Sequence, residues 1–361
     1  YSIELIPDQT FGDSGEPYLR NLYLQSVDDK GRVLITEQAG MDTPLHVYNP
    51  DGSYLTQVGR SGRGPGDYGL ISIASVRAGK LFVYDLGNLR LNIYDSKTYE
   101  FERSVRREDW SVLDHEAVQN MRLSVLYTRD DGNHIAHFYN QSNEIFPELT
   151  VTDSVRQTYI LVNSDGDVLN PEPLVIPHRY FLSRERQTSD GGSHRLPLAA
   201  PFLGGGSIFA LAGDGTMYIA WLDDFLIKKY DDQWRYQSAF YYPVKGPPFD
   251  FDSFEGFRGY SPREIRQALQ ASDLEIPDSY PVLREIKADD EDRIWARVRV
   301  ESDDKDAWWV LDDSGRLLAR FLWPRREPIH EIKDGYLYSR ILSSEDETGK
   351  VIRHRIELTE R

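Results

Sequence analysis

A tight turn followed by an apolar strand recurs along the chain, and this repeat limits the possible folds more than any other feature. Each copy places Gly or Asp in the turn and β-branched, aromatic or other apolar residues after it. The copies are centred on Gly31, Gly79, Gly132, Gly215, Asp292 and Gly335. A unit of about 45 residues with four strands is what a propeller blade requires. The repeat therefore predicts an all-β, six-bladed β-propeller with four antiparallel strands in each blade.

A second turn recurs in five of the six repeats, where the third strand joins the fourth. Asx and Gly residues supply the left-handed backbone conformations that hairpin turns need. These turns begin at Asn49, Asp95, Asn163, Asp231 and Asp312.

The sixth repeat has no such turn after Val351–Leu358. An unclosed ring would leave edge strands exposed. We therefore expect the alternating run Ser2–Pro7 to supply the missing strand and to close the last blade. The alternative is a detached N-terminal arm.

The repeat also predicts the blade boundaries. With 40% apolar residues, a chain of this length can bury the core of one closed ring, so we expect a single domain over residues 1–361. The predicted blades span about 19–58, 71–105, 119–176, 206–243, 282–323, and 329–361 together with 1–7.

The segment between the first two blades carries a family resemblance. Residues Gly59–Tyr68 read GRSGRGPGDY, and the strand patterns of Gly79–Asp85 and Asn88–Asp95 follow. These motifs resemble the repeat of NHL-type six-bladed β-propellers, in particular a group of bacterial exported proteins and lipoproteins. The match is good in the first two blades and rests elsewhere on the turns and the second strand. The resemblance implies a propeller that is often extracytoplasmic. It implies no single activity, because the fold hosts binding scaffolds, lactonases and lyases.

Composition narrows the partners. The net charge of -17 argues against nucleic acid and anionic membranes, which need a basic surface. No run of 18 apolar residues exists, so no membrane span is expected, and without cysteine the chain has no disulfide or thiolate site. We expect a monomer that is periplasmic, secreted or a cell-surface lipoprotein. An export segment or lipid anchor preceding Tyr1 would fit this location.

The lengths of the connections distinguish the two faces of the ring. We label the strands of a blade a to d from the axis outward. The a-to-b and c-to-d turns are short and lie on one face, the short-turn face. The long segments 106–118, 177–205 and 244–281 are all d-to-a connections on the other, the loop-rich face. Because loops on a rigid scaffold carry binding residues, we expect function on the loop-rich face. Tolerated insertions without a role are the alternative.

The insertion 177–205 is locally cationic in an acidic chain. Arginine binds carboxylate, sulfate or phosphate with two parallel hydrogen bonds, which makes this loop a candidate anion site. Pairing of these residues with the protein's own acidic surface is the alternative. The candidates are Arg179, Arg184, Arg186 and Arg195 with His178 and His194.

The segment before the third blade is a candidate catalytic region. We expect it to deliver His115 and Glu116 near the channel mouth, where a His beside a carboxylate can act as a base or a metal ligand. A structural role is the alternative. Together with His178 and Tyr180, these residues would form the catalytic set of an enzyme.

Two further segments hold candidate binding residues. In the linker, Arg60, Arg63 and Tyr68 stand among glycines whose amides could form an anion nest, although the resemblance favours a staple between blades with the aromatic ring buried. In segment 244–281, Ser261 and Glu264 form a capping box that predicts one helix. Aromatic residues beside this helix, with Phe254 as the ligand-binding candidate, either stack on ligands or hold the helix down.

The motifs that are missing limit the enzyme classes. The sequence has no H-E-x-x-H, G-x-S-x-G or P-loop motif and no calcium-loop pattern, so we expect no metal site and no cofactor. A divalent cation such as Ca²⁺ in the channel would need oxygen ligands from several blades. We therefore expect a binding scaffold that recognises a protein, peptide or glycan on the loop-rich face. The alternatives are an enzyme of the lactonase or polysaccharide-lyase type and a structural subunit of a larger assembly.

Overall fold

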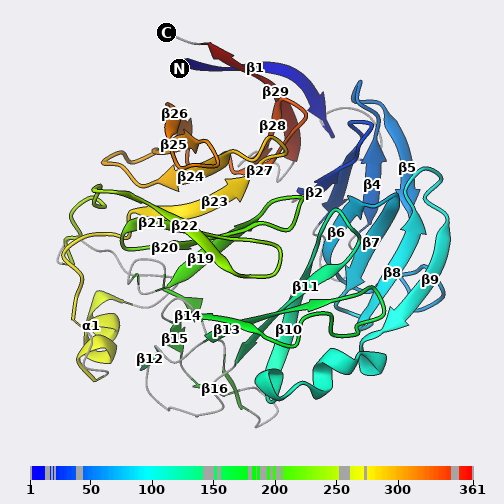
Figure 1. Cartoon of the computed structure of the whole chain (residues 1–361), viewed down its shortest axis with the longest axis horizontal. Helices are drawn as coiled ribbons and strands as arrows, with labels where there is room; N and C mark the ends of the chain where they lie inside the picture. The colour runs from blue at the N-terminus through cyan, green and yellow to red at the C-terminus, as the bar shows by residue number, and fades with distance from the viewer. Residues whose placement is uncertain are drawn as a thin grey trace.

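The structure is a computed structural model that describes residues 2–12, 17, 19, 22–37, 44–140, 150–152, 156–177, 181–183, 185–187, 193–195, 198–200, 204, 206–251, 261–271, 275–342 and 349–359. These residues form six four-stranded antiparallel sheets arranged like blades around a central axis (Figure 1). The predicted six-bladed β-propeller is therefore confirmed.

The first three blades follow the chain order from the axis outward. The first blade contains β2 (Leu22–Val27), β3 (Val33–Glu37), β4 (Leu45–Tyr48) and β5 (Tyr54–Val58). The second contains β6 (Ile71–Arg77), β7 (Lys80–Asp85), β8 (Arg90–Asp95) and β9 (Phe101–Arg106). The third contains β10 (Met121–Thr128), β11 (His134–Asn140), β13 (Arg156–Val162) and β14 (Leu174–Pro177).

The remaining blades complete the ring. The fourth contains β19 (Ser207–Leu211), β20 (Met217–Trp221), β21 (Phe225–Tyr230) and β22 (Tyr236–Tyr242). The fifth contains β23 (Leu283–Ala288), β24 (Ile294–Val298), β25 (Lys305–Leu311) and β26 (Leu317–Pro324). The sixth contains β27 (Ile329–Lys333), β28 (Tyr336–Leu342), β29 (Gly349–Thr359) and β1 (Ser2–Phe11).

The two ends of the chain close the sixth blade together. Strand β1 runs antiparallel to β29, with pairs from Ser2 opposite Thr359 to Phe11 opposite Val351 (Figure 1). The predicted closure by the N-terminal strand is confirmed. The strand is longer than the predicted run because its end is also held: Phe11 is fully buried, and Asp8 pairs with an arginine of β29.

A recurrent turn joins strands on the short-turn face. In the turn after β21, the Asp231 carboxylate accepts hydrogen bonds from the amides of Gln233 and Arg235 at 3.0 and 2.9 Å. Its second oxygen pairs with the Arg235 Nε atom at 2.8 Å. Three other turns repeat this arrangement of an Asp with an Arg four residues later. They are Asp28 with Arg32, Asp289 with Arg293, and Asp312 with Arg316.

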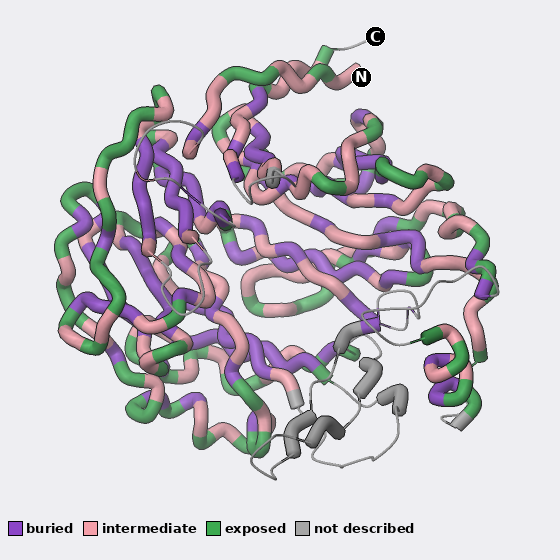
Figure 2. The backbone as a smooth tube through the Cα atoms, turned by 180° about the vertical axis from the view of Figure 1, so that it is seen from behind, coloured by how far each residue is buried: buried purple, intermediate pink, exposed green. Residues whose placement is uncertain are grey.

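The hydrophobic core lies largely between neighbouring blades. One cluster packs the second blade against the third, and another packs the fourth against the fifth. Figure 2 shows that buried residues follow the strands, whereas exposed residues gather at the turns. The blades therefore hold one another as a rigid ring around the channel.

The innermost strands of five blades contain a β-bulge, which the sequence did not predict. A bulge redirects side chains that strict alternation would place on the other face of the strand. In the sixth blade the register shifts between Ile329 and Glu331, so that His330 is the extra residue. The bulged residues are Gln25, Ser72, Ser124, Arg284 and His330.

The loop-rich face carries a small additional sheet. Strand β12 (Thr150–Thr152), from the b-to-c connection of the third blade, pairs with β15 (Phe181–Ser183), which in turn pairs with β18 (Leu198–Ala199). Strands β16 (Glu185–Gln187) and β17 (Ser193–Arg195) form a hairpin beside it. This pairing joins a b-to-c and a d-to-a connection, as expected if both lie on one face.

Helix α1 (Pro262–Ala271) lies on the same side as β12 (Figure 1). Its capping box is formed as predicted: the amide of Ser261 donates to the Glu264 carboxylate at 3.0 Å, and the amide of Glu264 donates to the Ser261 hydroxyl at 3.3 Å. Ile265, Ala268 and Leu269 form its buried face. The predicted helix is therefore confirmed.

Candidate ligand-binding channel

A cavity of about 880 Å³ occupies the short-turn end of the central channel. Its walls are the innermost strands and the a-to-b turns of all six blades. This volume is in the range of sites for small ligands. One lining residue from each blade, in order, is Gln25, Ser75, Thr128, Phe209, Lys287 and Glu331.

Polar side chains connect the innermost strands around the cavity. Gln25 of the first blade accepts a hydrogen bond from the amide of Ala74 in the second at 3.0 Å. The Ser75 hydroxyl of the second blade donates to the Thr128 hydroxyl of the third at 2.8 Å. These bonds fix neighbouring strands to one another, so the cavity is preformed.

Arg77 places a positive charge across the cavity. Its Nε atom lies 2.9 Å from Asp130 of the third blade, and its Nη2 atom lies 4.0 Å from Glu331 of the sixth. The side chain is about one quarter exposed. The third and sixth blades thus hold one guanidinium of the second blade, which leaves it oriented but accessible.

Negative charge dominates the lining. Besides Arg77, the lining has two cations, and both are paired. Lys333 lies 2.8 Å from Asp29, and Lys287 lies 2.8 Å from Glu285. Burial, with the nearby charge of Asp214, raises the pKa of Asp292. The cavity therefore favours neutral or positively charged ligands and repels anions. Its carboxylates are Asp29, Asp130, Asp214, Asp289, Asp290, Asp292 and Glu331.

The bulge in β27 places two titratable neighbours, His330 and Glu331, on the same cavity. Burial, with the charges of Lys287 and Arg340, lowers the pKa of His330 to about 3, so its imidazole is neutral at pH 7. Burial raises the pKa of Glu331, although Arg77 opposes this. Within the described part of the chain, the His330 Nε2 atom is buried without a hydrogen-bond partner.

Aromatic rings form one wall of the cavity. Phe209 meets Tyr127 edge to face, with ring centroids 4.8 Å apart, and meets Tyr159 at the same distance. Such rings offer apolar faces beside the polar groups described above. The cavity thus combines hydrogen-bonding, charged and aromatic surfaces.

The structure does not place His115 on this cavity. Its Nε2 atom bonds the Pro171 carbonyl at 3.0 Å, and its Nδ1 atom accepts from the Ala117 amide at 3.2 Å. Both ring nitrogens are thus used within the chain, and Glu116 is exposed. The expected position of these two residues near the mouth on the loop-rich face stays a prediction; the segment contacts the c-to-d connection of the third blade.

Apolar packing holds this segment in place. The segment forms three short 3₁₀ turns, and Trp110, Val112 and Val118 are buried in the core between the second and third blades. Trp110 lies so close to Gly166 that a Cβ atom there would come within 2.2 Å of the ring, and φ at this glycine is +84°. The turns are η1 (Arg107–Asp109), η2 (Ser111–Asp114) and η3 (Glu116–Val118).

The linker before the second blade is anchored on the first blade. Tyr68 is fully buried, and its hydroxyl donates to the Val58 carbonyl at 2.9 Å and accepts from the Leu45 amide at 3.0 Å. The Asp67 carboxylate accepts from an amide of the glycine-rich loop at 3.0 Å, so the chain's own acid occupies this donor. Arg60 is exposed and pairs with Asp67.

Arg63 is also exposed, and its carbonyl accepts a hydrogen bond from Arg90 at 3.4 Å. The linker therefore serves the structure chiefly as the predicted staple. Exposed Arg60 and Arg63 stay candidates for ligand binding.

The cationic insertion 177–205 stays a prediction. His178, Arg179, Tyr180 and Arg184 lie outside the described residues. The backbone pairs Arg186 with His194, and Arg195 with Glu185, in the β16–β17 hairpin.

The aromatic segment before α1 is described in part. Phe254 lies outside the described residues. Phe249 and Phe251 are buried and meet edge to face at 5.9 Å, and Arg266 of the helix lies over the Phe251 ring. Phe251 thus contacts the helix directly, and Phe249 packs against Phe251 and Tyr280.

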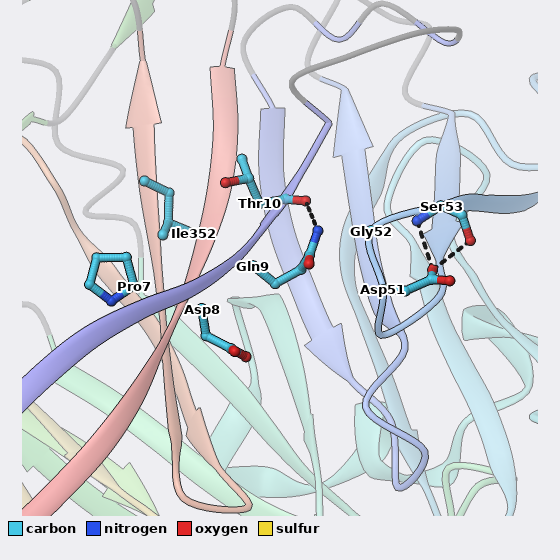
Figure 3. Close-up of a pocket in the computed structure, with 8 residues that line it drawn as sticks. All are labelled: Pro7, Asp8, Gln9, Thr10, Asp51, Gly52, Ser53 and Ile352. Carbon is cyan, nitrogen blue, oxygen red and sulfur yellow. Dashed lines mark hydrogen bonds between the residues drawn. The ribbon is translucent and has the colours of Figure 1, made fainter.

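A second cavity, of about 610 Å³, lies where the closing strand passes the first blade (Figure 3). Pro7, Asp8, Gln9 and Thr10 of β1 face the turn Asp51–Ser53 there. The Gln9 amide bonds the Thr10 carbonyl, and Asp51 accepts from Ser53. Its polar groups serve the chain's own backbone, so we assign this cavity to ring closure.

Sequence reasoning missed the channel residues. Their side chains are ordinary strand residues such as Gln25, Ser75 and Glu331, which carry no motif. One signal was available. The innermost strand of each blade ends at an anchor turn, and the anchor turns surround one end of the channel. Among the described residues, no group of three or more His, Asp or Glu side chains could hold a metal ion.

Comparison with known proteins agrees with the fold. The DUF5128 family, described as a 6-bladed β-propeller, matches residues 22–156. No curated protein is significantly similar in sequence. A candidate exported protein of Bacteroides fragilis has a similar structure, with 14% identity, a TM-score of 0.53, and coverage of 99% of this chain and 96% of that one.

Two further solved structures have lower scores. A member of the DUF4221 family from Bacteroides vulgatus has 10% identity, a TM-score of 0.49 and coverage of 99% of each chain. An aldose sugar dehydrogenase from Streptomyces coelicolor, in its PQQ-bound form, has 10% identity, a TM-score of 0.47 and coverage of 99% of each chain. Within the described residues, no helix is long and apolar enough to cross a membrane. The NHL-type assignment stays a prediction, and the comparisons support a six-bladed β-propeller.

Proposed function

We propose that the protein is a binding scaffold whose ligand enters the central channel from the short-turn face. The observation that carries this proposal is the cavity of about 880 Å³, to which all six blades contribute. A preformed concave site with a few converging polar groups is the usual form of a ligand-binding site.

The lining selects the ligand. The lining has seven carboxylates and three cations, and Arg293 neutralises one of the carboxylates, Asp289; the remaining excess of acid disfavours phosphate, sulfate and uronate groups. The His330 Nε2 atom, which has no partner among the described residues, and the carboxylates beside the Phe209 wall suit a neutral or amino-bearing sugar of a glycan. We therefore assign a neutral or cationic glycan as the ligand, and peptides with basic side chains rank second.

The same proposal includes an extracytoplasmic location and a monomeric state. A similar structure is described as a candidate exported protein, and the linker resembles that of exported propellers. An extracellular glycan would be encountered in that location. Fractionation of the native host distinguishes a periplasmic protein from a secreted one and from one that is lipid-anchored at the cell surface.

Filling the cavity tests the proposal. Ser75→Trp places a large ring inside the channel, whereas Leu55→Trp adds the same ring on an exposed outer strand. Calorimetry with neutral xylo-oligosaccharides, chitosan oligosaccharides and anionic oligogalacturonates should find binding of a neutral or amino sugar. Ser75→Trp should abolish it and Leu55→Trp should not. Preference for the galacturonates, or binding unchanged in Ser75→Trp, would contradict the proposal.

An enzyme remains a second candidate because the bulge brings His330 and Glu331 to one cavity. A neutral imidazole and a carboxyl with raised pKa can act as base and acid. In that case Glu331→Gln should abolish turnover of a bound glycan while its affinity changes less than threefold. Bound glycan recovered intact after long incubation with the wild-type protein would leave the scaffold as the function.

A further inference from the structure

A separate cavity of about 520 Å³ lies on the loop-rich side of the fifth blade. Pro247 and Tyr280 reach it from the connection before the blade, and residues 299–303 come from its b-to-c connection. Arg325 follows β26 and completes the wall. We call this cavity the arginine pocket.

One buried carboxylate organises the arginines beside this pocket. The side chain of Asp306 is only 1% exposed, and it lies 2.8 Å from the Arg297 Nε atom, 3.2 Å from Arg325 and 3.5 Å from the Arg284 Nη1 atom. Three guanidinium groups therefore share a single acid. A second acid, Glu285, lies 3.7 Å from Arg297, but it also pairs with Lys287.

Arg325 uses its donors within the chain. It bonds the carbonyls of Ser302, Asp303 and Lys305 at 2.8 to 3.2 Å in addition to Asp306. This pattern clamps the b-to-c connection around the pocket. Arg325 and Arg297 thus act as the frame, and their donors are not left for a ligand.

Arg299 is different. Its guanidinium lies over the Tyr280 ring at 4.1 Å, and its Nε atom is buried without a hydrogen-bond partner among the described residues. Stacking on a ring holds the guanidinium plane in place and leaves its edge free to donate. A buried donor without a partner costs free energy that a ligand could recover.

The buried charges around the pocket are not balanced. Arg284, Arg297 and Arg325 pair with the single buried acid Asp306, and Arg299 adds a further positive charge nearby. Burial, with repulsion from the neighbouring arginines, lowers the pKa of Arg284 to about 10 and also lowers that of Arg299. The carboxylates of Glu301 and Asp303 stand at the exposed rim, where water screens them.

We propose that the arginine pocket binds an oxyanion, with Arg299 as the donor to the ligand. A carboxylate, phosphate or sulfate matches the edge of a guanidinium and supplies the negative charge that the cluster lacks. The site lies on the face opposite to the channel opening and takes the opposite charge. It does not depend on the proposed function of the channel.

The test uses the whole chain and three small anions. Inorganic phosphate, sulfate and glucuronate are titrated by calorimetry at constant ionic strength, with chloride as the reference salt. The matched variants are Arg299→Gln and Arg316→Gln, the latter at an exposed turn arginine on the short-turn face. We expect saturable binding of at least one anion, weakened about tenfold by Arg299→Gln and unchanged by Arg316→Gln.

The anion that binds most tightly identifies the class of natural ligand. Glucuronate indicates a uronic acid, whereas phosphate or sulfate indicates an esterified ligand. If Arg299→Gln fails to fold, Tyr280→Leu replaces it, because it removes the ring on which Arg299 stacks and should also weaken anion binding. Absence of saturable binding, or equal weakening in the turn variant, overturns the proposal.

Discussion

The two faces of the ring use the same pair of residue types in opposite ways. On the short-turn face, each Asp of the recurrent turns has its own Arg four residues later and accepts backbone amides as well. At the arginine pocket, one Asp306 serves arginines from three separate parts of the fifth blade. The comparison teaches that a local pair closes on itself, whereas a cluster assembled by the fold can leave charge for a ligand.

The largest expected effect comes from removing the central acid of the cluster. Asp306→Asn leaves several buried guanidinium groups without a full counter-charge, which should cost about 3–5 kcal/mol of unfolding free energy. The matched change Asp312→Asn in a turn should cost about 1 kcal/mol, because its partner Arg316 is exposed to water. Urea denaturation of both variants checks the difference. Equal losses would show that Asp306 is not the organising charge.

Low pH should reduce the stability of the fold through one buried histidine beside the channel. His134, beside the channel, bonds the Thr128 hydroxyl at 3.1 Å, and burial lowers its pKa to about 4 from 6.5. The unfolded chain therefore binds more protons between these values, so stability is present above pH 6.5 and is lost as the pH falls toward 4. This one group should cost about 2 kcal/mol at pH 5.

His134→Gln is the matched variant for this effect. The gap in unfolding free energy between wild type and variant should shift by about 2 kcal/mol between pH 8 and pH 5 in favour of the variant. Denaturant titrations at both pH values measure it. A constant gap would mean that His134 does not titrate in this range.

The smallest effect is expected in the linker. Arg60 pairs with Asp67, but its side chain is 79% exposed. Arg60→Met should change the unfolding free energy by less than about 0.5 kcal/mol, as for most surface ion pairs. A loss of several kcal/mol in the same assay would place Arg60 in the staple, beside buried Tyr68.

The fold was predictable because its signals are local. Each anchor turn lies within a few residues of the strand that it precedes, and the capping box at Ser261 spans three residues. Closure by β1 followed from the missing turn after β29. Such features depend on neighbours in sequence, where propensities act directly.

The sites were less predictable because they depend on register and on distant residues. His330 reaches the cavity through a bulge, which only the pairing of β27 with β28 reveals. Arg284, Arg299 and Arg325 come from different elements of the fifth blade and carry no common motif. For His115 the charged neighbours suggested chemistry, whereas the structure shows that both ring nitrogens bond backbone atoms of the same chain.

The most direct test of the channel as a selective site uses introduced thiols, since the chain has no cysteine. Ser75→Cys places one in the channel, and Ser302→Cys places one in the arginine pocket. Reaction rates with a cationic and an anionic methanethiosulfonate are each divided by the rate with a free thiol. We predict roughly tenfold preference for the cationic reagent in the channel and for the anionic reagent in the pocket. No reaction at Ser75→Cys, or preference for the anionic reagent there, would contradict the proposed channel site.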